Sequence, residues 1–423
     1  MRRILLLITF FCASLNLTYA QFSLKADFRA RGEYRDGARI LLSDSLEPTF
    51  VASQRTRLIA DYKDDKFQIR IGLQNARIWG NDDERANIPN INLSEGWFKY
   101  ALLPSLAAKV GRQHLVLDDG RIFGMRNWND IAVSHDLAVL QYEKNDWNIL
   151  AGGGYNNDGN DYTASPYNVK YYKYLVFLWV NRTFENGLQV SLLHSTDANE
   201  DKTDFTKTNK RNTVGLYSKY SSNSNFGFEG SAYYQYGKHT SGLDQSGYMF
   251  SLIPSYQLSE KVKLVAGTNY FSGNNQLDTT STTNRSFNKL FGDGHRYYGL
   301  LDYFLNIEDN TDRTGVQELF AGVFIKTSEK SELEISYHHF ATTGALIDTQ
   351  SPKFKAADAE LGSEIDLQYK HKVNSYFTVV LNYATMFATP SMEILKGGDH
   401  NRYQQWANLM LIAKPELFRS DKK

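Results

Sequence analysis

The sequence predicts an all-β protein: a transmembrane antiparallel β-barrel of the outer-membrane type, with about eighteen strands. Residues 22–35 alternate between apolar and polar side chains at every position, which is the period of a β-strand with two different faces. Aromatic residues make up 14% of the chain, and outer-membrane barrels concentrate aromatic side chains at both membrane interfaces. After residue 20, no segment approaches the roughly 18 consecutive apolar residues of a membrane-spanning helix.

The polar face of residues 22–35 carries too many charges for a dry protein core. Six of its seven positions are charged, namely Lys25, Asp27, Arg29, Arg31, Glu33 and Arg35, and charges are costly to bury. A tilted strand of this length crosses a bilayer at about 3.3 Å per residue. We therefore expect an apolar surface in outer-membrane lipid and a water-filled lumen.

The N-terminus has the pattern of a secretory signal peptide. Arg2 and Arg3 precede an apolar run at residues 4–12, and Ala20 supplies a small residue before a cleavage site. We expect residues 1–20 to be removed and residues 21–423 to form a single barrel domain. An N-terminal membrane anchor is disfavoured because the apolar run is too short. The only cysteine, Cys12, lies in the signal peptide, so disulfides are not expected.

Similar alternation recurs along the chain, and short connections alternate with long ones. The other predicted strands are residues 50–62, 66–79, 91–102, 106–115, 132–142, 147–155, 172–184, 188–195, 212–220, 226–236, 248–258, 262–271, 316–326, 333–340, 361–371, 377–387 and 403–412. Residues 226–236 place Phe226 and Phe228 at one end of a face, and Tyr234 and Tyr236 at the other. Short periplasmic turns and longer external loops are typical of outer-membrane barrels. Long external loops are expected near residues 36–49, 80–90, 116–131, 156–171, 196–211, 238–247, 341–360 and 388–402.

Residues 295–305 also resemble a strand, but the alternation of turns argues against it. The preceding strand runs outward and residues 316–326 must run inward, so only zero or two strands fit between them. We choose zero, which makes residues 272–315 one large external loop. Its aromatic residues Tyr297, Tyr298, Tyr303 and Phe304 will not lie bare in water. We expect the loop to fold inward and narrow the pore.

Basic residues are concentrated on the lumen face of the first strands. Residues 21–130 hold 12 of the 19 arginines that follow residue 20. By strand phase, the predicted lumen stripe consists of Lys25, Arg29, Arg31, Arg35, Arg55, Arg57 and Arg70. Such a stripe attracts carboxylate or phosphate groups, or else its members pair with neighbouring acids and stiffen the wall. The face on which Arg112 lies stays open, because Gly111 is a possible bulge.

Acidic residues predominate on the lumen face of the later strands. This predicted acidic arc consists of Glu318, Glu332, Glu334, Glu364 and Asp366, with Lys370 beside it. Opposed basic and acidic arcs set a field across the lumen and orient charged solutes. The alternative, incidental polarity of a wet wall, stays open.

Signatures of catalysis and of other partners are weak. The sequence has no Gly-x-Ser-x-Gly, His-Glu-x-x-His or P-loop motif. We assign no catalytic residue, metal site or cofactor. Without the signal peptide, 45 basic residues stand against 47 acidic ones, so the charge gives no reason to expect nucleic acid.

Several segments resemble one family. They are Glu33-Tyr34-Arg35-Asp36-Gly37, Ser53-Gln54-Arg55-Thr56-Arg57-Leu58, Leu73-Gln74-Asn75-Ala76-Arg77-Ile78-Trp79-Gly80, Lys109-Val110-Gly111-Arg112-Gln113, Ser134-His135-Asp136, and Met386-Phe387-Ala388-Thr389 through Gly397-Gly398. Together they are similar to alginate-export-type outer-membrane proteins over nearly the whole chain after residue 20. The resemblance implies an eighteen-stranded barrel, and the best-known member passes an anionic uronate polymer.

We expect a channel that passes anionic sugars or polysaccharide by passive diffusion through an arginine-lined lumen. A general diffusion porin of weak selectivity is the first alternative. An outer-membrane barrel enzyme and a structural or adhesive barrel are the others. The sequence leaves the solute and the direction of transport open.

Overall fold

The computed structural model describes residues 21–81, 90–157, 159, 162–167, 171–221 and 225–420. The predicted signal peptide lies outside these residues, and its cleavage after Ala20 stays a prediction.

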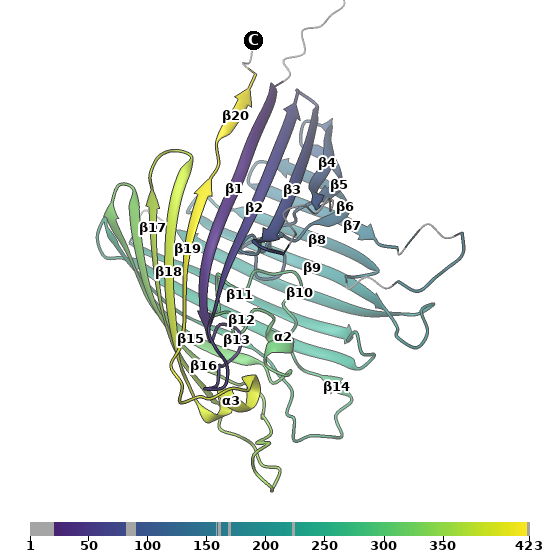
Figure 1. The fold of residues 1–423 in the computed structure, drawn as a ribbon. Helices are drawn as coiled ribbons and strands as arrows, with labels where there is room; N and C mark the ends of the chain where they lie inside the picture. The colour runs from purple at the N-terminus through teal and green to yellow at the C-terminus, as the bar shows by residue number, and fades with distance from the viewer. Residues whose placement is uncertain are drawn as a thin grey trace, which may run out of the picture.

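The described chain forms a closed antiparallel barrel of eighteen strands (Figure 1). The wall consists of β1 (Gln21–Asp36), β2 (Thr49–Lys63), β3 (Phe67–Ile78), β4 (Ile91–Leu103), β5 (Leu106–Gln113), β6 (His135–Lys144), β7 (Trp147–Tyr155), β8 (Tyr174–Thr183), β9 (Leu188–Glu200), β10 (Thr208–Ser221), β11 (Phe226–Lys238), β12 (Asp244–Gln257), β13 (Val262–Phe271), β15 (Val316–Ser328), β16 (Ser331–Ala341), β17 (Glu360–Lys372), β18 (Phe377–Ala388) and β19 (Gln404–Ala413). Consecutive strands pair with each other, β13 pairs directly with β15, and β1 pairs with β19 to close the ring.

In the described part of the chain, four short elements lie outside this set. β14 (Thr283–Asn284) pairs in parallel with β12, and β20 (Glu416–Arg419) pairs with the beginning of β1. The helices α2 (Ile307–Asn310) and α3 (Pro390–Lys396) lie in external loops. Within the described part of the chain, no helix has the length and apolarity to cross a membrane.

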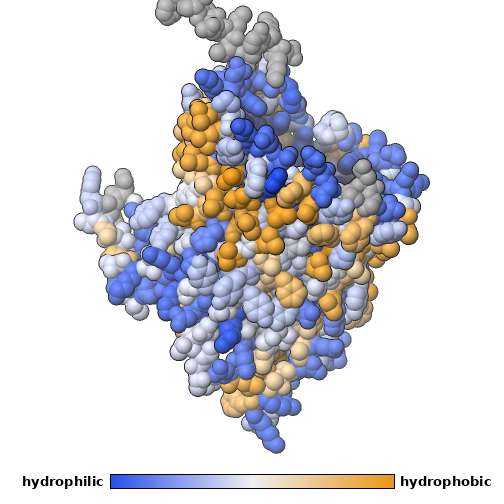
Figure 2. Space-filling view, turned by 180° about the vertical axis from the view of Figure 1, so that it is seen from behind, coloured by the Kyte–Doolittle hydropathy of each residue, from blue (hydrophilic) through white to orange (hydrophobic). Residues whose placement is uncertain are grey.

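The predicted alternation of faces is confirmed. Phe226, Tyr234 and Tyr236 of β11 are exposed on the outer surface, whereas Tyr233 and Gln235 between them are buried. Figure 2 shows apolar residues (orange) gathered across the middle of one face, with hydrophilic residues (blue) towards both ends. This arrangement is that of a lipid-facing belt between two wet rims.

The alternation of turns is also confirmed. Residues 295–305 form no strand, and residues 272–315 connect β13 to β15. The loops expected at 196–211 and 238–247 are shorter than predicted, because β9 to β12 extend into them: β9 continues to Glu200 and β10 begins at Thr208. Arg112 keeps the outward phase without a register shift and bonds Asp136 of β6 at 3.0 Å.

Candidate functional site

Two external loops fold into the barrel and pack against its inner wall. The first inserted loop is residues 114–134 and the second is residues 272–315. A bridge between Phe123 and Phe291 joins them. Together with the wall they bury one apolar cluster, which includes Leu117, Ile122, Phe123, Phe287, Leu290 and Tyr298 of the loops and Leu137, Phe177, Trp179, Leu193, Tyr233 and Met249 of the wall. The lumen therefore contains a packed core whose wall residues extend from β6 round to Trp406 of β19.

The predicted constriction aromatics belong to the second inserted loop, but most of them do not line an opening. Tyr298, Tyr303 and Phe304 are almost fully buried. The Tyr303 hydroxyl donates to the Gly37 carbonyl, and Phe304 packs on Phe340 of β16 with ring centroids 4.7 Å apart. Tyr297 lines a cavity. These side chains fasten the loop inside the barrel.

Four arginines of the predicted basic stripe hold the first inserted loop in place. We call Arg29, Arg31, Arg55 and Arg57 the arginine clamp. Arg29 donates to the carbonyls of residues 127, 128 and 129 at 2.8–2.9 Å and to Asp130 at 2.7 Å. Arg31 donates to the Trp128 carbonyl at 3.0 Å and lies over its ring.

Arg55 and Arg57 reach the same loop from β2. Both donate to the Asn127 side-chain oxygen, at 2.9 and 3.2 Å. Arg55 also pairs with Asp27 at 3.1 Å, and Arg57 donates to Gln74 at 2.6 Å. The arginine clamp is buried, and most of the hydrogen bonds of its guanidinium groups go to the loop and to the wall.

The other three residues of the stripe lie apart from the loop. Arg35 pairs with Glu33 at 3.1 Å, and Arg70 pairs with Asp61 at 2.7 Å. Lys25 lies opposite Glu416 in the register between β1 and β20. The structure thus brings the clamp together and distributes the rest along the wall.

Two members of the predicted acidic arc fasten the second inserted loop. The N–H groups of Leu300 and Leu301 donate to Asp366 at 3.0 Å and to Glu364 at 2.8 Å. Gly299 precedes them with φ +80°, and a Cβ there would lie 2.5 Å from Glu364. Glycine tolerates this left-handed conformation, so it allows the two amides to meet the carboxylates.

His338 joins this acidic group on the wall. It contacts Glu318 at 2.6 Å and Asp366 at 3.3 Å. Glu318, Glu364 and Asp366 are all buried. Glu332 and Glu334 differ, because Glu332 is exposed near Lys370, and Glu334 is half-buried beside a cavity.

Asp118 holds the first inserted loop against the wall, and the sequence analysis did not identify it. It lies in the first inserted loop and accepts from the Trp179 ring nitrogen of β8 at 3.0 Å. Burial raises the pKa of its carboxyl to about 6, although hydrogen bonds from Ser191 and Trp179 oppose the shift. The apolar run at residues 175–180 could have indicated this contact. Both faces of that strand are apolar, so its lumen face had to be covered by another segment.

The space left in the lumen includes three neighbouring cavities. An upper cavity of about 470 Å³ lies between the two inserted loops and the wall, with Arg126, Asn127, Trp128, Asp293 and Gln368 among its lining residues. A lower cavity of about 470 Å³ lies against β10–β16, and a third of about 270 Å³ lies near the short-turn rim. Arg296, Glu334 and His338 line both the upper and the lower cavity.

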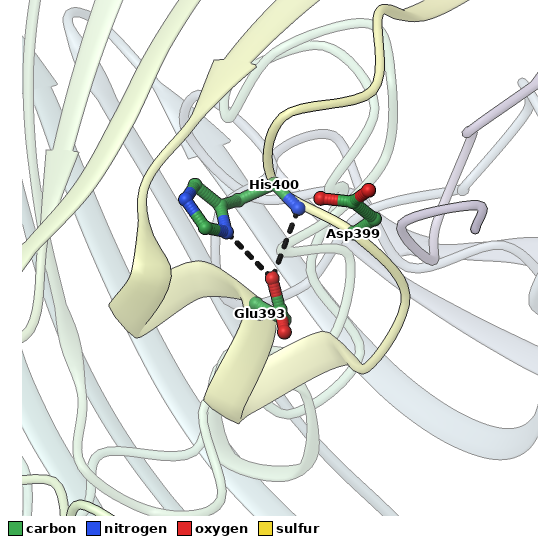
Figure 3. A group of neighbouring side chains, drawn as sticks. All are labelled: Glu393, Asp399 and His400. Atoms are coloured by element: carbon green, nitrogen blue, oxygen red, sulfur yellow. Dashed lines mark hydrogen bonds and ion pairs between the residues drawn. The ribbon is translucent and has the colours of Figure 1, made fainter. Parts of the chain in front are cut away.

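A separate group of potential ligand residues lies in the external loop that contains α3 (Figure 3). Ligand atoms of Glu393, Asp399 and His400 all lie within 4.8 Å of one another. His400 contacts Glu393 at 2.6 Å through its ring and at 3.1 Å through its backbone N–H, and the ring contact lowers the pKa of Glu393. These bonds close the turn at Gly397 and Gly398, and we assign no metal to them.

Similarity to known proteins supports the barrel assignment. Several solved structures from Pseudomonas aeruginosa share the fold. OccK10 (OpdN) superposes with a TM-score of 0.61 at 11% identity, covering 94% of this chain and 99% of that one. OpdO gives a TM-score of 0.63 at 12% identity, covering 94% and 98%. The outer membrane protein OpdK gives 0.59 at 11% identity, covering 93% and 99%. No curated protein matches the sequence.

The family is shown by the sequence itself. The model of the family described as alginate export matches residues 20–391, which include most of the wall and both inserted loops. The resemblance drawn from the short segments is confirmed. The chain belongs to the alginate export family of outer-membrane β-barrels.

Proposed function

We propose that this outer-membrane barrel channel passes anionic sugars or polysaccharide by passive diffusion. The barrel fold and the family support a channel in the outer membrane. Passive diffusion needs only a concentration gradient of the solute. We therefore assign no cofactor, no nucleic-acid partner and no catalytic residue. Lipid surrounds the wall, and an anionic saccharide is the proposed solute.

Charge in the lower part of the lumen carries this proposal. The lower and third cavities are lined by six basic residues and three acidic ones, namely Lys219, Lys261, Lys263, Arg296, Lys326 and Lys370 against Glu229, Glu332 and Glu334. Lys219 pairs with Glu229 at 2.8 Å and Lys370 lies 3.9 Å from Glu332, which leaves a positive excess. A cleft lined mainly by one sign of charge raises the local concentration of the opposite ion.

The predicted basic stripe contributes to the proposal in a limited way. The arginine clamp contributes positive potential, but its donors are bonded to the first inserted loop. This observation favours a second candidate function, a general diffusion porin of weak selectivity. The two candidates differ in the size of the anion preference and in the response to uronates.

A planar-bilayer recording separates them. We expect the reversal potential under a KCl gradient to show preference for Cl⁻, and galacturonate or oligouronates to interrupt the current. Neutral glucose at the same concentration is the control. Preference for K⁺ would contradict the proposed function. A current equally insensitive to uronate and glucose would favour the general porin.

A further inference from the structure

We propose that Arg296 of the second inserted loop is the residue that selects carboxylate-bearing solutes in this channel. The inference rests on the proposed function and assigns its specificity to one side chain outside the predicted stripe. Arg296 is one of three residues that line both the upper and the lower cavity. A solute that moves between these cavities therefore passes Arg296, Glu334 and His338.

Arg296 differs from the other loop cations around the upper cavity because its guanidinium is available. It is exposed, and its guanidinium lies over the Tyr297 ring, 5.1 Å from the ring centroid. Arg126 instead donates to the carbonyls of residues 290 and 292, and buried Lys289 donates to the carbonyl of residue 292.

The other two residues shared by the cavities, His338 and Glu334, do not supply a second unpaired positive charge. His338 is buried between Glu318 and Asp366. Glu334 is half-buried and bonds Ser336 at 3.2 Å. The passage between the cavities thus presents one exposed guanidinium and one partly exposed carboxylate, so removal of Arg296 leaves an acidic passage.

The chemistry of these groups specifies a class of solute. A guanidinium binds a carboxylate through two parallel hydrogen bonds. The Glu334 carboxylate accepts hydrogen bonds from hydroxyl groups, and Gln368 and Asn306 line the upper cavity with amide groups that both donate and accept hydrogen bonds. A carboxylate with neighbouring hydroxyls, as in a sugar acid, uses both sets of groups. A carboxylate without hydroxyls uses only Arg296.

The test compares Arg296→Gln with a matched control in the full-length channel. Arg285→Gln removes an exposed arginine from the same loop, and Arg285 lines none of the three cavities described above. At about 5 Å in bulk water, one charge changes the local concentration of a monovalent ion about fourfold. We expect Arg296→Gln to lower the Cl⁻/K⁺ permeability ratio severalfold at low salt, and Arg285→Gln to leave it unchanged. Arg296→Lys should retain the Cl⁻ preference but weaken block by galacturonate, because lysine lacks the planar pair of donors.

The outcomes distinguish this inference from the proposed function. If the wild type prefers K⁺ or ignores uronates, the proposed function fails. If the wild type prefers Cl⁻ and Arg296→Gln has the same reversal potential and the same uronate block, Arg296 is not the selecting residue. Different electrophoretic mobilities of unheated and heated samples confirm that each variant is a folded barrel. A much larger conductance in Arg296→Gln would also contradict the inference, because it would show that the loop had moved.

Discussion

Loss of the arginine clamp should release the first inserted loop and enlarge the channel. The perturbation is Arg29→Gln, which removes three bonds to backbone carbonyls and the ion pair to Asp130 at 2.7 Å. Both partners of this pair are largely buried, with side-chain exposures of 5% and 20%. Removing one partner of a buried pair typically costs about 3–5 kcal/mol. Released loops should therefore become roughly 10²–10⁴ times more frequent relative to docked ones.

The assay is single-channel conductance in a planar bilayer. We expect Arg29→Gln to show transitions to larger conductance levels that are rare in the wild type. Arg35→Gln is the matched control, because Arg35 lies on the same face of β1 but contacts Glu33 and not the loop. If Arg29 instead acted as a free ligand for anions, its loss would lower Cl⁻ preference at unchanged conductance. That result would refute the clamp.

Three further changes test other parts of the structure. In the docked loop, the pKa of Asp118 is raised from its ordinary 3.8 to about 6. Docking of the loop is therefore most favourable below about pH 4, and it loses about 3 kcal/mol as the pH rises to 6. Current noise should be lower at pH 5 than at pH 7. Asp118→Asn should be quiet at both values, and a variant that keeps the wild-type pH dependence would show that Asp118 is not responsible. Deletion of residues 284–311 should raise the conductance of a folded barrel, whereas unchanged or lower conductance would mean that the second inserted loop does not restrict the pore. Leu216→Lys places a charge on the exposed outer face of β10 and should cost about 2–4 kcal/mol near the bilayer centre; an unchanged unfolding free energy in lipid would place Leu216 outside the apolar belt.

The wall was predictable from the sequence because its determinants are local. A strand in lipid must keep every second side chain apolar, and the turns must alternate between the two rims. These rules identified all eighteen strands and excluded residues 295–305 from the wall. They were less accurate at the external ends, where β9 and β10 extend as a hairpin to Glu200 and Thr208. Polar ends of strands and polar loops have the same composition.

The interior was less predictable because its contacts join residues that are distant in the chain. Strand phase placed Arg29 and Glu364 in the lumen, but it did not indicate that backbone groups of two loops would bond them. Residues 116–131 were read as an ordinary external loop, although Asn127 and Asp130 are held by the clamp. Carbonyl and amide partners are common to all residues and leave no signature in composition.

Closure of the barrel between β1 and β19 limits when this protein can become stable in a membrane. Phe28 pairs with Ala413 and Asp36 with Gln405, so the seam joins the earliest and latest wall strands of the chain. Before it forms, both strands expose unpaired backbone groups, each of which costs several kcal/mol in lipid. A partly synthesised chain therefore has no stable transmembrane form, and it must stay unfolded or shielded during its passage through the periplasm. Insertion should follow delivery of the last strand, and a variant that lacks β19 should fail to accumulate in the membrane instead of forming a narrower barrel.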